Sequence, residues 1–208
     1  MTRIILFVLV AFFTNCAKGQ KHRLPPSPKF PTQKQLQQEE KNHTCVHRDR
    51  YTSKQRLLFY PFNSAAKIIV ASFDNKPDGN GMIEIGGNRL PMKNDTIDFS
   101  ALDEIRQLEE RQIDTLTDIL YNTGFRGSIF TMTGAGCYNP RNAILFVNKG
   151  GKAFAFIVLC FECGGHRVSS KKVNTGEFCD EKYDLLKRFF AKTGIEIGIT
   201  KGAGLHTE

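Results

Sequence analysis

Cysteine and histidine residues in the second half of the chain are the side chains best suited to chemistry. Residues 160–166 read CFECGGH, which combines a C-x-x-C pair with a histidine three residues later. Thiolate groups act as nucleophiles and redox groups, and thiolate and imidazole groups both bind zinc. Three roles are therefore open to this segment: thiol–disulfide exchange, zinc binding and the formation of structural disulfides.

The spacing and surroundings of the C-x-x-C pair favour structural disulfides. A thioredoxin-like redox pair lies at the start of a helix, whose dipole stabilises the thiolate, whereas this pair leaves a predicted strand and runs into two glycines. A zinc site would use Cys160 and Cys163, with Cys179 and either His166 or Cys137 as the remaining ligands. No second C-x-x-C is present to complete such a site.

In an oxidising compartment, the four cysteines of this half would form disulfides that hold the end of a hairpin to the last helix. These are Cys137, Cys160, Cys163 and Cys179. Four cysteines allow three pairings, and the sequence does not choose among them. Cys45 is either free, or pairs with one of the four and leaves another free.

A short loop before a predicted strand is a candidate binding loop. Residues 138–142 read YNPRN. Arg141 could meet an anionic partner, with Tyr138 as an aromatic anchor. The favoured alternative is that the Asn-Pro pair sets a turn and that Arg141 pairs with an acidic residue nearby. No catalytic residue is assigned, because His166 lacks an identifiable third residue to orient it in a nucleophile pair.

Hydrophobic patterning predicts the elements that position these residues. Strands are expected over 56–62, 67–73, 82–85, 128–133, 143–147 and 153–160, with a hairpin turn at 148–151. One helix is expected over about 109–122, or as part of a bent helix from residue 100, and another over about 180–193. The order lacks βαβ alternation. It predicts an α+β domain over 46–208, with a mainly antiparallel sheet of about 5–6 strands and two helices packed on one face.

The N-terminus carries the features of an export signal. Arg3 precedes ten apolar residues, which predicts a signal peptide over residues 1–15. Ten helical residues span about 15 Å, half of a bilayer core, so this segment is not a membrane span. Residues 13–16 read FTNC and resemble the lipobox of bacterial lipoproteins, although that motif usually begins with Leu and has a small residue before the cysteine. Lipidation of Cys16 is the favoured reading. The alternative is an ordinary signal peptide cut after residue 19.

The net charge of +8 is a property of the N-terminal part of the chain. Residues 16–45 are rich in proline and glutamine and are predicted to form a flexible tether. Basic residues exceed acidic ones in residues 17–60, whereas residues 61–208 carry equal numbers of each. A nucleic-acid-binding protein would carry its basic face on the folded domain, so no nucleic-acid partner is expected. A basic tether beside a lipid anchor would instead contact anionic head groups.

The signal, the lipobox-like Cys16 and the polar tether make the chain similar to small bacterial envelope lipoproteins. The resemblance covers mainly residues 1–45 and implies anchoring at the outer membrane or in the periplasm, without implying an activity. We therefore expect a membrane-anchored, non-enzymatic envelope protein that binds a protein or a small ligand, for example an immunity-type inhibitor of a secreted toxin. The alternative expectation is a thiol or zinc protein that uses Cys160, Cys163, Cys179 and His166. A soluble secreted protein is the alternative location.

Overall fold

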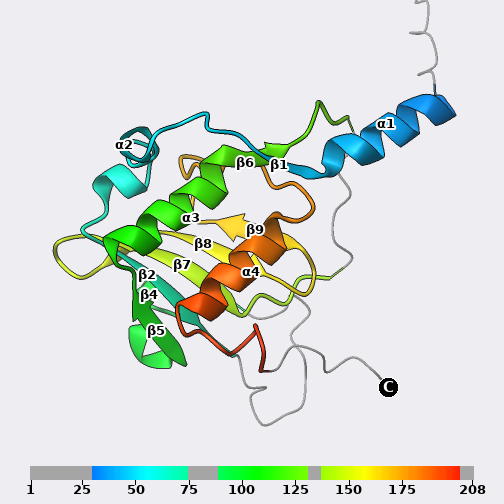
Figure 1. Cartoon of the computed structure of the whole chain (residues 1–208). Coiled ribbons are helices and arrows are strands. Elements are labelled where there is room, and N and C mark those ends of the chain that lie inside the picture. The colour runs from blue at the N-terminus through cyan, green and yellow to red at the C-terminus, as the bar shows by residue number, and fades with distance from the viewer. Residues whose placement is uncertain (1–29, 75–88, 131–136, 202–208) are drawn as a thin grey trace, which may run out of the picture. The chain divides into compact units, whose positions relative to one another are not determined.

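The computed structural model describes residues 30–74, 89–130 and 137–201 (Figure 1). The predicted signal peptide, Cys16 and the strand expected at 82–85 lie outside these residues. The chain from Gln33 onward forms one unit. Within the described part of the chain, no helix has the length and apolar character needed to cross a membrane.

Five antiparallel strands form the main sheet in the order β5-β2-β7-β8-β9. They are β2 (Lys67–Ser72), β5 (Glu104–Gln107), β7 (Asn142–Val147), β8 (Ala153–Cys160) and β9 (Gly165–Val168). The predicted hairpin between β7 and β8 is confirmed. Its turn is held by Asn148, whose Oδ1 accepts hydrogen bonds from the backbone nitrogens of Gly150 and Lys152 at 2.9 and 3.1 Å.

The remaining elements of the described residues are four α-helices, two short 3-10 helices and two small sheets. The helices are α1 (Gln33–His43), α2 (Ser53–Arg56), α3 (Glu110–Asn122) and α4 (Lys182–Lys192), with η1 (Phe62–Ser64) and η2 (Phe99–Ala101). β1 (Cys45–His47) pairs with β6 (Thr123–Phe125), and β3 (Met92–Lys93) pairs with β4 (Thr96–Ile97). α3 and α4 agree with the helices predicted over 109–122 and 180–193.

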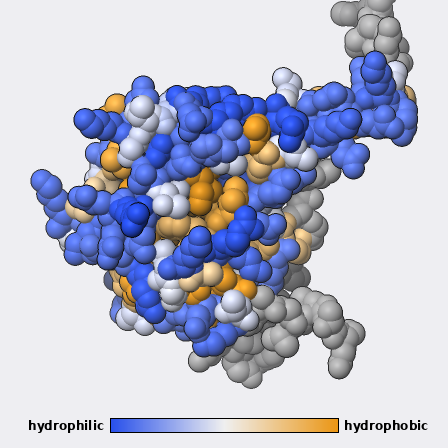
Figure 2. Space-filling view, viewed as in Figure 1, coloured by the Kyte–Doolittle hydropathy of each residue, from blue (hydrophilic) through white to orange (hydrophobic). Residues whose placement is uncertain are grey.

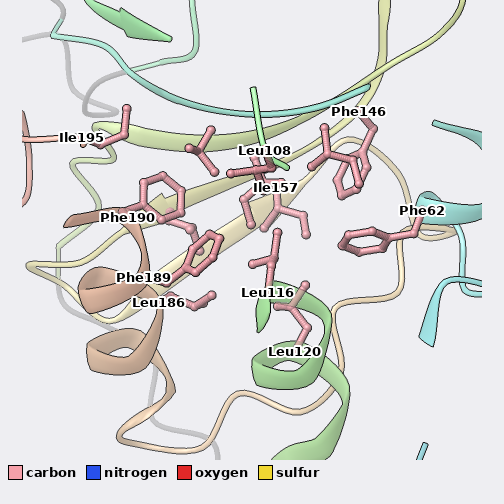
Figure 3. Close-up of a cluster of buried hydrophobic side chains, with 14 of the residues drawn as sticks. Phe62, Leu108, Leu116, Leu120, Phe146, Ile157, Leu186, Phe189, Phe190 and Ile195 are labelled. Carbon is pink, nitrogen blue, oxygen red and sulfur yellow. The ribbon is translucent and has the colours of Figure 1, made fainter. Parts of the chain in front are cut away.

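α3 and α4 share one apolar cluster with the main sheet (Figure 3). The cluster contains Leu116 and Leu120 of α3, Leu186 and Phe190 of α4, and Val70, Ile144 and Ile157 of three neighbouring strands. The three strand residues are paired in register and therefore lie on one face of the sheet. Both helices lie across this face in Figure 1. The predicted α+β class and mainly antiparallel sheet are confirmed.

The outer surfaces of α3 and α4 are polar. Figure 2, drawn from the same side as Figure 1, shows a mainly hydrophilic face with apolar side chains visible between the two helices. The opposite face of the sheet carries a second apolar cluster, which includes Ala71, Leu145 and Val158 from the strands and Ile97 from β4. The sheet is therefore buried on both faces, which explains why β7 is apolar at nearly every position.

The strand predicted over 56–62 is wrong. Thr52 caps a helical turn there, because its side chain accepts from the backbone of Gln55 while the Gln55 side chain accepts from the backbone of Thr52. The short helix α2 follows, and its Arg56 is buried. The short strands β1, β5, β6 and β9 were not predicted, because each has only three or four residues and no clear alternation.

Residues 33–45, which were expected to form part of a flexible tether, instead form α1 and the start of β1. Asn42 donates through Nδ2 to the backbone oxygen of Ser128 at 2.8 Å, and the backbone nitrogen of Phe130 donates to Glu39 at 2.8 Å. Cys45 is bonded to Cys179. This segment has no apolar stripe, and polar contacts and a disulfide attach it to the rest of the fold instead. The folded unit therefore begins near residue 33 and not at residue 46.

Candidate functional site

Four of the five cysteines in the described residues form two disulfides. Cys137 is bonded to Cys163 across 26 residues, and Cys45 is bonded to Cys179 across 134 residues. Cys160 is a free thiol and is 1% exposed. Of the two alternatives for Cys45, the second is therefore the one observed: Cys45 pairs with Cys179, and Cys160 is left free. The two disulfides indicate an oxidising, extracytoplasmic environment.

The zinc ligands considered from the sequence are not brought together. Cys163 and Cys179 are bonded to different cysteines, so neither offers a thiolate to a metal ion. Among residues 30–74, 89–130 and 137–201, no group of three or more histidine, cysteine, aspartate or glutamate side chains is arranged to hold a metal ion.

His166 lies on β9 and packs against the segment that leads into α4. Its Nδ1 lies 2.9 Å from the hydroxyl oxygen of Tyr183, and its ring stacks on Phe178 with the ring centroids 3.7 Å apart. Burial and the nearby charge of Lys182 lower the pKa of His166, so the imidazole is neutral at pH 7. These contacts give His166 a structural role in joining β9 to α4.

The two side chains of the candidate binding loop also make contacts within the chain. The guanidinium of Arg167 lies 4.1 Å from the ring centroid of Tyr138. Burial raises the pKa of Tyr138 to about 12, and its hydroxyl has no hydrogen-bond partner in the described residues. Arg141 lies 3.9 Å from the carboxylate of Glu162, which agrees with the alternative in which Arg141 pairs with a nearby acid.

A cavity of about 230 Å³ lies where α3 ends, and sequence analysis did not identify it. Its lining includes Arg48, Arg50, Tyr51, Phe59, Tyr121 and Glu177, which come from segments far apart in the sequence. The tyrosines and arginines that line it are spread over more than 70 residues of chain, and no motif links them. Only the folded structure brings them together.

Three aromatic rings form one wall of the cavity. The ring of Phe59 meets the edge of Tyr51 at a centroid distance of 5.0 Å and lies 4.7 Å from the ring of Tyr121. The Tyr121 hydroxyl donates to the backbone oxygen of Asn174 at 3.0 Å, and burial raises the pKa of Tyr121 well above its usual value. The wall is therefore held by ring packing and by a hydrogen bond to Asn174, which also lines the cavity.

Buried polar side chains fix Tyr51 in this wall. Asn122 is 3% exposed and makes two hydrogen bonds to the backbone of Tyr51. Arg56 is 6% exposed and donates through Nη1 to the backbone oxygen of Tyr51 at 2.9 Å. The same guanidinium pairs with Asp114 and Asp118 of α3. The loop that carries Tyr51 is thus attached to α3 at several points.

Positive charge lines the cavity on the side of β1 and β6. Arg48 donates to the backbone oxygens of Phe125 and Arg126 at 2.8 and 3.0 Å, which fixes its guanidinium. Arg50 is exposed, and its side chain makes no hydrogen bond or ion pair with other residues that the structure describes. Glu177 accepts from the backbone nitrogen of Phe125 at 3.0 Å. Arg50 is therefore the charged group most available to a ligand.

Comparison of the chain with protein-family models, with curated proteins and with solved structures finds no match. The cavity offers aromatic faces, two guanidinium groups and a carboxylate already bound to the backbone. This set of groups is suited to binding through stacking and charge.

Proposed function

We propose that the protein is an exported, membrane-anchored and non-enzymatic protein of the bacterial envelope, which binds an acidic segment of a partner protein in the cavity at the end of α3. Export is supported by the two disulfides and by the signal-like residues 1–15. Anchoring is supported by the lipobox-like Cys16. An immunity-type inhibitor of a secreted toxin is one specific form of this function.

The aromatic wall beside the unpaired Arg50 is the observation that carries the proposal. Tyrosine and arginine are enriched among the residues that dominate binding energy at protein interfaces. A cavity of about 230 Å³ is smaller than the usual pocket for a drug-sized ligand and fits a single side chain of a partner. Leu57 and Leu58, which are 40% and 71% exposed, precede Phe59 of the wall and extend the apolar surface beside it.

Charge around the cavity favours an acidic partner segment. Arg48 and Arg50 line the cavity, and the exposed Lys171 and Lys172 lie on the loop that leads to its rim at Asn174. Glu177 is the acidic residue among those that line the cavity, and its carboxylate accepts a hydrogen bond from the backbone nitrogen of Phe125. An acidic segment would be attracted to this surface, and complementary charge mainly increases the rate and specificity of association.

A cross-linking experiment with a charge reversal tests this function. A photoreactive amino acid is placed at Leu58 of the full chain in its native membrane, and cross-linked proteins are recovered with a C-terminal tag and identified. We expect one reproducible partner, and we expect Arg50→Glu to reduce its recovery by about fivefold or more, the loss expected for an interface residue that contributes above 1 kcal/mol.

The matched control is Arg188→Glu, which reverses an exposed charge on α4 that does not line the cavity. Recovery of the partner should be unchanged by this substitution. A partner that is recovered equally with Arg50→Glu would contradict the cavity as the binding site. The recovery of no reproducible partner would contradict the proposed function itself.

A further inference from the structure

Three cysteines meet at one end of the main sheet, around the hairpin that joins β8 to β9. Cys160 is the last residue of β8, and its Cα partner across the hairpin is Gly165. Cys163 lies in the turn between these two residues and is bonded to Cys137. A free thiol and a disulfide sulfur are therefore held in the same hairpin, separated by two residues of the C-x-x-C motif.

Tyr138 places the Cys137 segment against the end of this hairpin. A Cβ added at Gly165 would lie 3.2 Å from the Tyr138 ring, so the ring packs directly on the backbone opposite Cys160. The charge of the Cys160 thiolate also adds to the effect of burial in raising the pKa of Tyr138. Both observations put Cys160 close to the residue that follows Cys137.

We propose that Cys137, Cys160 and Cys163 form a thiol–disulfide exchange site. In this exchange the Cys160 thiolate attacks Sγ of Cys163, a bond forms between Cys160 and Cys163, and the bond between Cys163 and Cys137 breaks. The proton of the Cys160 thiol passes to solvent, and Cys137 leaves as a thiolate that solvent protonates. One disulfide replaces another, so no external oxidant or reductant takes part.

The exchange moves the free thiol from a buried position to an exposed one. Cys160 is 1% exposed and shielded from thiols and oxidants in solution, whereas Cys137 is an exposed residue. A thiolate at Cys137 could attack a disulfide of a partner molecule, which the thiol at Cys160 cannot reach. This site is distinct from the cavity at the end of α3, and its inference does not depend on the proposed binding function.

The local chain favours the exchange. The reacting groups belong to one hairpin, so the step is intramolecular and needs no encounter. C-x-x-C cysteines form disulfides with each other in redox proteins. Cys163 is followed by Gly164, with φ of 58°, and by a second glycine, so the turn can change conformation without a clash from a Cβ atom.

Tryptic peptides report the exchange directly. The full chain is incubated at about pH 8.5, near the ordinary pKa of a thiol, then denatured and treated with N-ethylmaleimide at acidic pH before digestion. Cys160 and Cys163 share the peptide 153–167, and Cys137 lies on the peptide 127–141. The native bond links these two peptides and leaves the label on Cys160. The exchanged bond separates them and leaves the label on Cys137.

We expect the separated, Cys137-labelled form to appear at about one tenth of the total or more, a population within about 1.4 kcal/mol of the native bond. Its rate of appearance should be independent of protein concentration, as an intramolecular step requires. The matched control is Cys160→Ala, in which the two peptides should stay linked. Label that remains on Cys160 alone after prolonged incubation would overturn the proposal, as would separation of the peptides in Cys160→Ala.

A second variant tests whether the new bond can form. Cys137→Ala leaves Cys163 without its usual partner, and oxidised glutathione should then close a disulfide between Cys160 and Cys163 within the peptide 153–167. The circular dichroism spectrum shows whether this variant is folded. A folded variant that forms only mixed disulfides with glutathione would show that the hairpin cannot close this bond, and the proposal would fail.

Discussion

Asn122 at the end of α3 holds the backbone of Tyr51 from both sides. Its Oδ1 accepts from the backbone nitrogen of Tyr51 at 2.9 Å, and its Nδ2 donates to the backbone oxygen of the same residue at 3.0 Å. The two residues are separated by 71 positions in the chain. The buried side-chain amide of Asn122 therefore pairs with both backbone groups of Tyr51, as a neighbouring strand would. It fixes Tyr51, and with it the aromatic wall of the cavity, to α3.

Replacement of Asn122 should destabilise the protein and loosen the cavity. In Asn122→Ala, the partly buried backbone nitrogen of Tyr51 loses its partner and the backbone oxygen keeps only the bond from Arg56, so the free energy of unfolding should fall by about 1–3 kcal/mol. Urea unfolding measures this loss. Lys54→Ala, on the exposed surface of α2, is the control and should change stability by less than about 0.5 kcal/mol. Equal stability of the two variants would show that Asn122 does not hold the loop.

The parts of the fold that were predicted correctly have strong local patterns. Residues 143–147 and 153–160 are apolar runs joined by an Asn-Lys-Gly-Gly turn, and α4 has apolar residues at helical spacing. These patterns arise from residues that are close together in the sequence, so they can be recognised without knowledge of long-range contacts. The segment 56–62 is apolar but does not form a strand, because only some of its apolar residues enter the core and they do so from helical turns: Phe62 is 5% exposed in the 3-10 helix η1, whereas Leu57 and Leu58 are exposed.

The cavity could not be found from the sequence, because its residues share no spacing. Tyr51 and Tyr121 become neighbours only when Arg56 and Asn122 attach the first loop to α3. The pairing of Cys45 with Cys179 is likewise set by the packing of α1 and β1, whose polar sequence gives no sign of burial. The C-x-x-C motif was visible, but its relation to Cys137 depends on a contact between distant segments.

The proposed lipidation of Cys16 predicts that the protein is found in the membrane fraction of cells. Cys16→Ala should move the mature protein from the membrane pellet to the soluble fraction when it is expressed in a bacterial host, because two or more acyl chains are needed for stable anchoring. Fractionation and the intact mass of the mature chain measure this. Cys160→Ala is the matched control and should remain in the pellet. A wild-type protein that is soluble and begins after residue 19 would show that an ordinary signal peptide is removed.

The two disulfides should differ in their contribution to stability. Under the chain-entropy model, loops of 134 and 26 residues correspond to roughly 5 and roughly 3.5 kcal/mol of stabilisation. The Cys45→Ala/Cys179→Ala variant should therefore unfold at lower urea concentration than the Cys137→Ala/Cys163→Ala variant, and Cys160→Ala, which breaks no disulfide, serves as the control. The reverse order would show that α1 and β1 are held mainly by their polar contacts, and that the bond at Cys45 adds little.

The buried Lys182 predicts a pH dependence of stability with a definite sign. Its side chain is 0% exposed, and its Nζ donates to the backbone oxygen of Leu120 at 2.7 Å. The titratable groups near it include Glu177 and His166. Burial lowers its pKa to about 7 from an ordinary value of 10.5. Between these two values the unfolded chain binds more protons than the folded chain. The stability contributed by this group therefore rises with pH across that window, by up to about 1.4 kcal/mol per pH unit, and is constant below about pH 7.

Urea unfolding of Lys182→Met tests this prediction, in a Cys160→Ala background that prevents thiol–disulfide exchange at high pH. Other titrating groups are common to both proteins and cancel in the difference between them. We expect the stability of Lys182→Met relative to the protein with Lys182 to be highest near pH 6 and to fall steadily between pH 7 and 10, because only the lysine is relieved of its buried charge as pH rises. Lys192→Met, an exposed position at the end of the same helix, should show no such trend. A difference that stays constant from pH 6 to 10 would mean that the folded protein keeps Lys182 protonated as readily as the unfolded chain does, and that the contact with Leu120 and the nearby Glu177 fully compensate its burial.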